Sequence, residues 1–149
     1  AAIYALVRFV RYRRQNRTFF GQPIVPAPPR IVALRSLDHI RKQKLWQNGN
    51  QKQFYTEVTD ALRLYIAGRW GIATLERPSK EMLADLNKQK VDEKQFEVIS
   101  ELFSTSDLVK FAKYAASDAE NEEVIPTAVR FVNTTYLADI ESEQTDKEK

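Results

Sequence analysis

The residue types that most often carry out chemistry are scarce in this chain. It has one histidine, His39, and no cysteine. A Ser-His-Asp triad would need His39 as its only imidazole, and no Gly-x-Ser-x-Gly turn is present to expose a nucleophilic serine. Because the four glycines are scattered, there is no Gly-rich phosphate loop either. The sequence therefore predicts a protein that is not an enzyme.

One acidic group has oxygen ligands that a hard cation would accept: Asp118, Glu120, Glu122 and Glu123. It lacks the glycine turn and the alternating ligands of a calcium loop. The group follows Ser117, where a helix is expected to begin, and acidic side chains at a helix N-terminus are stabilised by the helix dipole. No metal or other cofactor is expected.

Charge is distributed very unevenly along the sequence. Residues 1–37 hold seven arginines and no acidic residue, so this part carries +7. The total is +3, so residues 38–149 carry −4. A nucleic-acid-binding domain more often spreads its basic residues over a folded face, which makes a nucleic-acid partner unexpected. Five arginines crowd into residues 8–17: Arg8, Arg11, Arg13, Arg14 and Arg17.

These arginines directly follow a short apolar run, residues 1–7 (AAIYALV). An apolar helix followed by basic residues is typical of a membrane helix that ends on the cytoplasmic side. Seven residues are too few to cross a bilayer, which needs about 20. We therefore expect residues 1–17 to be the end of a single membrane span of the inner membrane. The five arginines would contact anionic headgroups, and the domain behind them would lie in the cytoplasm.

Residues 18–33 contain four prolines and predict a linker. Proline removes a backbone donor and fixes φ, which disfavours a helix or a central strand. Such segments favour polyproline II and act as semi-rigid spacers. The linker would hold the following domain away from the membrane.

From residue 34 onward the sequence has helical periodicity and no sustained period-two alternation. Ser36 is expected to cap the first helix, and three capping-box pairs mark later helix starts: Asn50 with Gln53, Asp92 with Gln95, and Ser117 with Glu120. The strongest apolar stripe comprises Phe54, Val58, Ala61, Leu62, Tyr65 and Ile66. Residues 104–107 (STSD) predict a break, after which Leu108, Phe111, Ala112 and Ala115 would form a separate inward stripe. Pro126 is expected to kink the last helix or to mark its restart.

The fold predicted is all-α, a bundle of five to six short helices. Four segments are expected along the chain: the end of a membrane helix with its basic arm in residues 1–17, the linker in 18–33, the helical domain in 34–140, and a disordered acidic tail in 141–149.

Several runs resemble one protein family in both their residue types and their spacing. They are residues 44–49 (KLWQNG), 54–66 (FYTEVTDALRLYI), 69–72 (RWGI), 107–114 (DLVKFAKY) and 120–123 (ENEE). Across residues 31–137 the chain resembles the cytoplasmic domain of single-span membrane proteins of Bacteroidetes aerotolerance (Bat) operons. The resemblance implies a helical accessory protein of envelope stress or protein maturation. Its implied partners are a MoxR-type AAA+ ATPase or a von Willebrand A-domain membrane protein, and it implies no catalytic residue.

The leading hypothesis is thus a membrane-tethered, non-catalytic interaction domain. Two alternatives stay open: a nucleic-acid-binding regulator at the membrane, and an enzyme without recognisable motifs. Trp46 stands apart from the apolar side of its helix and is either packed on the next helix or exposed to a partner. A mixed-charge surface at residues 107–122 is the other partner-binding candidate. Its members are Asp107, Lys110, Lys113, Tyr114, Glu120 and Glu122.

Overall fold

The computed structural model describes residues 2–15, 28–74 and 77–147, and this part of the chain forms six helices and no strand. The all-α prediction is confirmed. None of these helices is both long and apolar enough to cross a membrane. The helices are α1 (Ala2–Gln15), α2 (Pro29–Gln43), α3 (Gln51–Trp70), α4 (Ser79–Asn87), α5 (Glu93–Phe111) and α6 (Asp118–Lys147).

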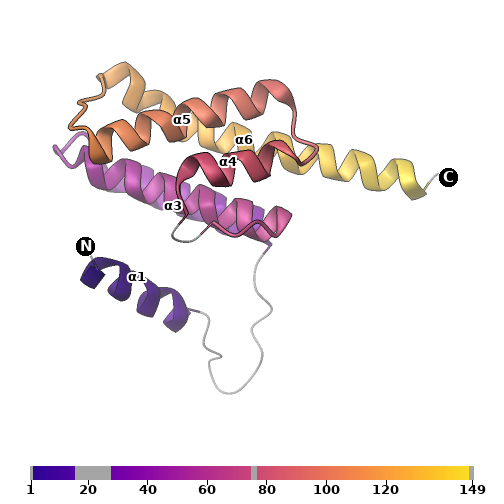
Figure 1. Ribbon diagram of the computed structural model, residues 1–149, viewed down its shortest axis with the longest axis horizontal. Helices are drawn as coiled ribbons and strands as arrows, with labels where there is room; N and C mark the ends of the chain where they lie inside the picture. The colour runs from indigo at the N-terminus through magenta and orange to yellow at the C-terminus, as the bar shows by residue number, and fades with distance from the viewer. Residues whose placement is uncertain (1, 16–27, 75–76, 148–149) are drawn as a thin grey trace.

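Four of the helices, α2, α3, α5 and α6, pack around a shared core. Contacts join α2 to α3, α3 to α5, α5 to α6 and α6 back to α2, and α3 also contacts α6 across the middle. Helix α4 packs on α5. Figure 1 shows α1 beside the bundle and outside this ring of contacts. The architecture is therefore a four-helix bundle with one short helix added to its surface.

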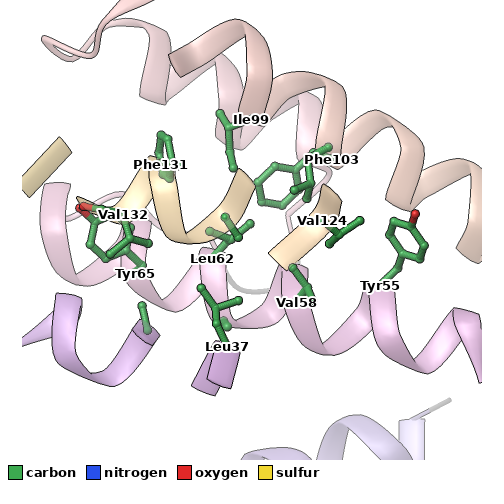
Figure 2. Close-up of a cluster of buried hydrophobic side chains, with 14 of the residues drawn as sticks. Leu37, Tyr55, Val58, Leu62, Tyr65, Ile99, Phe103, Val124, Phe131 and Val132 are labelled. Carbon is green, nitrogen blue, oxygen red and sulfur yellow. The ribbon is translucent and has the colours of Figure 1, made fainter. Parts of the chain in front are cut away.

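Helix α3 supplies the centre of the core. Tyr55, Val58 and Leu62 are fully buried, and they recur at the three- and four-residue spacing that places side chains on one helix face. Figure 2 shows them among Ile99 and Phe103 of α5. The strongest stripe of the sequence is thus the buried face that it predicts.

Helices α2 and α3 approach closely at Gly68. A Cβ atom at this position would lie 2.8 Å from Cγ of Pro29, closer than non-bonded carbon atoms allow. Gly71 follows α3 with φ of 68° and donates its N–H to the carbonyl of Ala67, the left-handed ending that glycine favours. Gly71 therefore ends α3, whereas Gly68 lies inside the helix.

Two of the three predicted capping pairs form a side-chain cap; Asn50 is the N-cap of α3, but its side chain accepts no hydrogen bond there. The carboxylate of Asp92 accepts a hydrogen bond from the N–H of Gln95 at the start of α5. The hydroxyl of Ser117 accepts one from the N–H of Glu120 at the start of α6, at 3.2 Å. These side chains satisfy N–H groups that have no partner within the first turn of a helix.

The C-terminal boundary predicted for the linker is wrong, because α2 begins at Pro29 and not at Ser36. Pro28 is the N-cap and Pro29 the first helical residue. Proline is well accommodated there, since the first N–H groups of a helix have no acceptor to bond within it. The rest of the linker, residues 18–27, lies outside the described residues.

The predicted break at residues 104–107 is also wrong. Helix α5 runs without interruption from Glu93 to Phe111, and Ser106 is buried within it. Serine and threonine are weaker helix formers, but packing of one helix face overrides such propensities. The inward stripe predicted after the break is wrong as well, because Leu108 and Phe111 are exposed.

Helix α6 is continuous through Pro126, so the helix does not restart there. Ala128, Phe131 and Val132 are buried just beyond it, and this packing holds the helix together on the C-terminal side of the proline. The helix extends to Lys147, past residue 140, where the sequence predicts that the helical domain ends.

Replacement of Leu62 by alanine tests the buried face. Since Leu62 is fully buried, Leu62→Ala is expected to lower the free energy of unfolding by about 2–5 kcal/mol, measured by urea denaturation. Leu137→Ala is the matched control, because Leu137 is exposed on α6 and should change stability by less than about 0.5 kcal/mol. Equal losses in the two variants would contradict the packing described above.

Candidate functional site

The candidate patch of residues 107–122 divides into two environments. Lys110 is half-buried, and its Nζ donates a hydrogen bond to Oγ1 of Thr59 at 2.7 Å. Burial lowers the pKa of Lys110, while the nearby charge of Asp60 acts in the opposite direction. Lys110 therefore joins α5 to α3 and is not a free surface cation.

Asp107 likewise contacts another helix and does not point freely into solvent. Its carboxylate accepts a hydrogen bond from Oγ of Ser79 at 3.3 Å, at the start of α4. Ser79 in turn accepts one from the guanidinium of Arg63 at 3.0 Å. These bonds connect α3, α4 and α5 through side chains, so Asp107 contributes to the fold.

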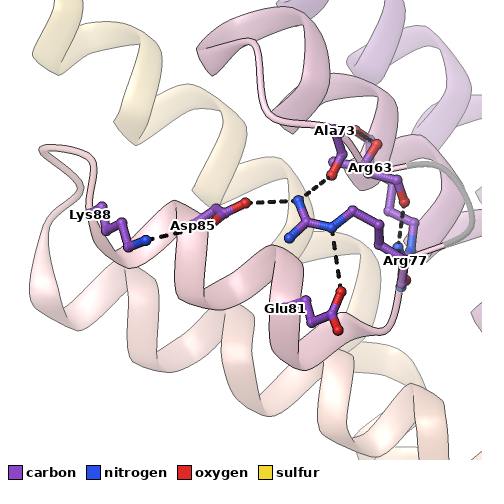
Figure 3. Close-up of polar contacts among 7 residues, drawn as sticks. Arg63, Ala73, Arg77, Glu81, Asp85 and Lys88 are labelled. Atoms are coloured by element: carbon purple, nitrogen blue, oxygen red, sulfur yellow. Dashed lines mark hydrogen bonds and ion pairs between the residues drawn. The ribbon is translucent and has the colours of Figure 1, made fainter.

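Arg63 also holds the segment between α3 and α4. Its Nη1 donates to the carbonyls of Thr74 at 2.7 Å and Arg77 at 2.9 Å. Figure 3 shows this region, where Arg77 also forms an ion pair with Asp85 at 2.7 Å. The hydrogen bond from Arg77 lowers the pKa of the Asp85 carboxyl. This network is structural, and it fixes where α4 starts.

The end of α5 is apolar and open to solvent. Phe111 is 82% exposed, Leu108 is 48% exposed and Tyr114 is 40% exposed. Large exposed apolar side chains that gather in one place mark interaction surfaces more often than single ones do. Lys113, also exposed, lies beside them with a positive φ of 56°. We call Leu108, Phe111 and Tyr114 the α5-end patch.

Tyr114 and Glu120 of the predicted surface are in direct contact. The phenol of Tyr114 donates to the carboxylate of Glu120 at 2.9 Å, across the connection between α5 and α6. This bond raises the pKa of Tyr114. Close by, the buried phenol of Tyr55 donates to Oδ1 of Asn121 at 2.9 Å. Burial and the charge of Glu120 raise the pKa of Tyr55 to about 12.

Trp46 and Glu122 lie elsewhere, along a cavity of about 490 Å³ between α2 and α6. Trp46 is partly buried against the core, where Ile125 and Val129 of α6 also pack. Trp46 is thus half-buried: it packs against the core and also lines this cavity. Glu122 belongs to this cavity and is separated from Glu120, although the two are only two residues apart.

The arginine arm is described only in part. Arg8 forms an ion pair with Asp60 of α3 at 3.0 Å, so it has a partner within the chain. Burial raises the pKa of Asp60, opposed by the charges of Arg8 and Lys110. Arg11, Arg13 and Arg14 belong to α1, but their side chains lie outside the described part of the structure, as does residue Arg17.

The described residues offer no group of three or more histidine, cysteine, aspartate or glutamate side chains that could hold a metal ion. His39 is exposed on α2. The prediction of a protein without catalytic or metal chemistry remains a prediction.

Sequence reasoning missed the exposure of Phe111, although a signal for it exists. The buried residues of α5 are Ile99, Leu102, Phe103, Ser106 and Val109. Continued at helical spacing through Ser106, this stripe places Phe111 off the buried face. Treating the polar residues 104–107 as a break hid that continuity.

Comparison with known proteins leaves the Bat-operon resemblance as a prediction. No protein-family model matches the chain, and no curated protein or solved structure is significantly similar to it.

Substitutions of Lys110 and Lys113 are expected to differ in their effect on stability. Lys110→Glu removes the bond to Thr59 and places a carboxylate near Asp60 and Asp107. It should lower the free energy of unfolding by about 1–3 kcal/mol, less than the loss from breaking a fully buried ion pair. Lys113→Glu should change it by less than about 0.5 kcal/mol because Lys113 is exposed. Thermal denaturation followed by circular dichroism measures both, and equal melting temperatures would contradict the described role of Lys110.

Proposed function

We propose that this chain is a membrane-tethered, non-catalytic interaction domain on the cytoplasmic side of the inner membrane. It acts as an accessory protein of a MoxR/Bat-type system for envelope stress or protein maturation. Its partner is a MoxR-type AAA+ ATPase or a von Willebrand A-domain membrane protein. The resemblance of residues 31–137 to Bat-operon proteins supports this choice of partner.

The exposure of Phe111 is the observation that carries the interaction part of the proposal. An 82% exposed phenylalanine contributes little to the stability of its own domain. Buried aromatic side chains, in contrast, are among the residues that contribute most to binding at interfaces. Leu108 and Tyr114 extend the surface, and Lys113 adds a charge at its edge, a mixture typical of transient protein contacts.

The tether is supported by α1. Four of its large apolar side chains are exposed: Ile3, Tyr4, Leu6 and Val7. The bundle does not cover them, although each would lose contact with water in a lipid environment. The arginines of the arm follow in the sequence, where anionic headgroups would meet them.

Capture of a partner tests the interaction. The full chain, immobilised in mild detergent, should retain a MoxR-type ATPase or a von Willebrand A-domain protein from membranes of its source, identified by mass spectrometry. Phe111→Ala should reduce capture at least about tenfold, as expected for an interface residue that contributes about 2 kcal/mol. Val32→Ala, which truncates an exposed apolar residue on α2, is the control and should leave capture unchanged. Capture of neither protein class by the wild-type chain would refute the proposal.

Binding to vesicles tests the tether. The full chain should cosediment with vesicles that contain phosphatidylglycerol, and more strongly at low salt than at high salt. A glutamine variant of four arginines should bind more weakly, by about 1 kcal/mol for each charge removed. Arg8 is kept because it pairs with Asp60. The four are Arg11, Arg13, Arg14 and Arg17.

The control variant removes four exposed lysines from the helical domain and so has the same net charge. If it loses as much vesicle binding as the arginine variant, total charge rather than the basic arm explains the binding, and the tether is contradicted. The lysines are Lys52, Lys80, Lys90 and Lys94.

A further inference from the structure

Between α5 and α6 lies a groove with a volume of about 580 Å³. Figure 1 shows the two helices running side by side along the bundle. Val98 and Leu102 of α5 and Val124 of α6 give the groove apolar walls. Tyr55 of α3 also lines it, and its phenol is held by Asn121. The groove is thus built mainly from three helices of the core, and Tyr114 adds to its lining from the connection between α5 and α6.

The charged side chains of this groove are all acidic. Glu101 comes from α5, and Glu120 and Glu123 come from α6. No lysine, arginine or histidine lines it. Glu120 accepts the hydrogen bond of Tyr114, whereas Glu101 and Glu123 have no hydrogen bond or ion pair within the described part of the chain. Two carboxylates are therefore available to an outside cation.

Two other cavities differ from it in charge. The one between α2 and α6 is lined by Asp38 and Glu122 together with Arg41. The one near the end of α3 is lined by two lysines and an arginine together with Asp92. Of these three cavities, the α5–α6 groove is the one whose lining charges all have the same sign. A single sign of charge in a cleft favours partners of the opposite sign.

The groove continues into the α5-end patch. On α5, Val98, Glu101 and Thr105 line the groove, and Leu108 follows at the same three- and four-residue spacing. Tyr114 belongs both to the groove lining and to the patch. An apolar surface thus lies at one end of an acidic groove, and a partner that covers Phe111 would extend into it.

We infer that the α5–α6 groove binds a basic amphipathic segment of the partner protein, with an apolar side chain on the groove walls and lysine or arginine at Glu101 and Glu123. The inference rests on the proposed function, because it specifies the chemistry of the partner at the same surface. Charge complementarity determines this choice of occupant: an acidic or a neutral apolar segment would leave both carboxylates unpaired at the contact.

A labelled peptide tests the inference directly. The probe is a short peptide with leucines spaced for one helix face and lysines and arginines between them. The control peptide has glutamates in place of the basic residues. Fluorescence polarisation with the full chain should detect binding of the basic peptide and not of the acidic one, and the affinity should fall as salt increases.

The variant Glu101→Gln/Glu123→Gln should weaken binding of the basic peptide at least about tenfold, because it neutralises both free carboxylates and leaves the groove walls intact. The matched control is Glu97→Gln/Glu122→Gln, which removes one exposed carboxylate from each of the same two helices outside the groove. Equal affinities of the two variants would overturn the inference.

Partner capture with the same variants separates this inference from the proposed function. Loss of capture with Phe111→Ala but not with Glu101→Gln/Glu123→Gln would overturn the groove alone. If the wild-type chain captures neither partner class, the proposed function fails, while the peptide titration still decides whether the groove binds basic segments. Sedimentation that shows self-association lost in Glu101→Gln/Glu123→Gln would assign the groove to the arginine arm of a second copy and overturn the inference.

Discussion

The structure depends on burial of helix α3 by three other helices. Tyr55, Val58 and Leu62 lose all contact with water only because α2, α5 and α6 pack around them together. Isolated helices are marginal in water, since most helical stability in proteins comes from packing of an apolar face. Helix α3 therefore determines where its neighbours lie, and its close approach to Pro29 at Gly68 fixes the position of α2.

Polar contacts at the edge of this core specify the remaining elements. Arg63 bonds the carbonyls that precede α4, and Ser79 links it to Asp107 of α5. Lys110 reaches back from α5 to Thr59. Because a half-buried charge without a partner costs free energy, these bonds favour one arrangement of α3, α4 and α5 over others. They also engage Asp107 and Lys110, two charged residues that would otherwise be exposed at the surface.

What remains on the surface is consequently different from the mixed-charge patch that the sequence predicts. With Lys110 and Asp107 engaged internally, the end of α5 presents apolar side chains, and the adjacent groove presents carboxylates. The proposed interaction function thus rests on Phe111 and its neighbours, and the inferred partner chemistry rests on Glu101 and Glu123. Both are consequences of how α5 and α6 pack.

The sequence by itself determined the local features of this protein. The caps at Asp92 and Ser117 and the stripe through Leu62 depend on residues a few positions apart, and all are present as predicted. Tertiary structure alone decided which side chains near helix ends are buried. Ser106 is buried and Phe111 exposed because α3 and α6 cover one side of α5, and α6 continues through Pro126 because Phe131 and Val132 pack beyond it. Such outcomes depend on contacts between residues far apart in the chain, which local spacing does not contain.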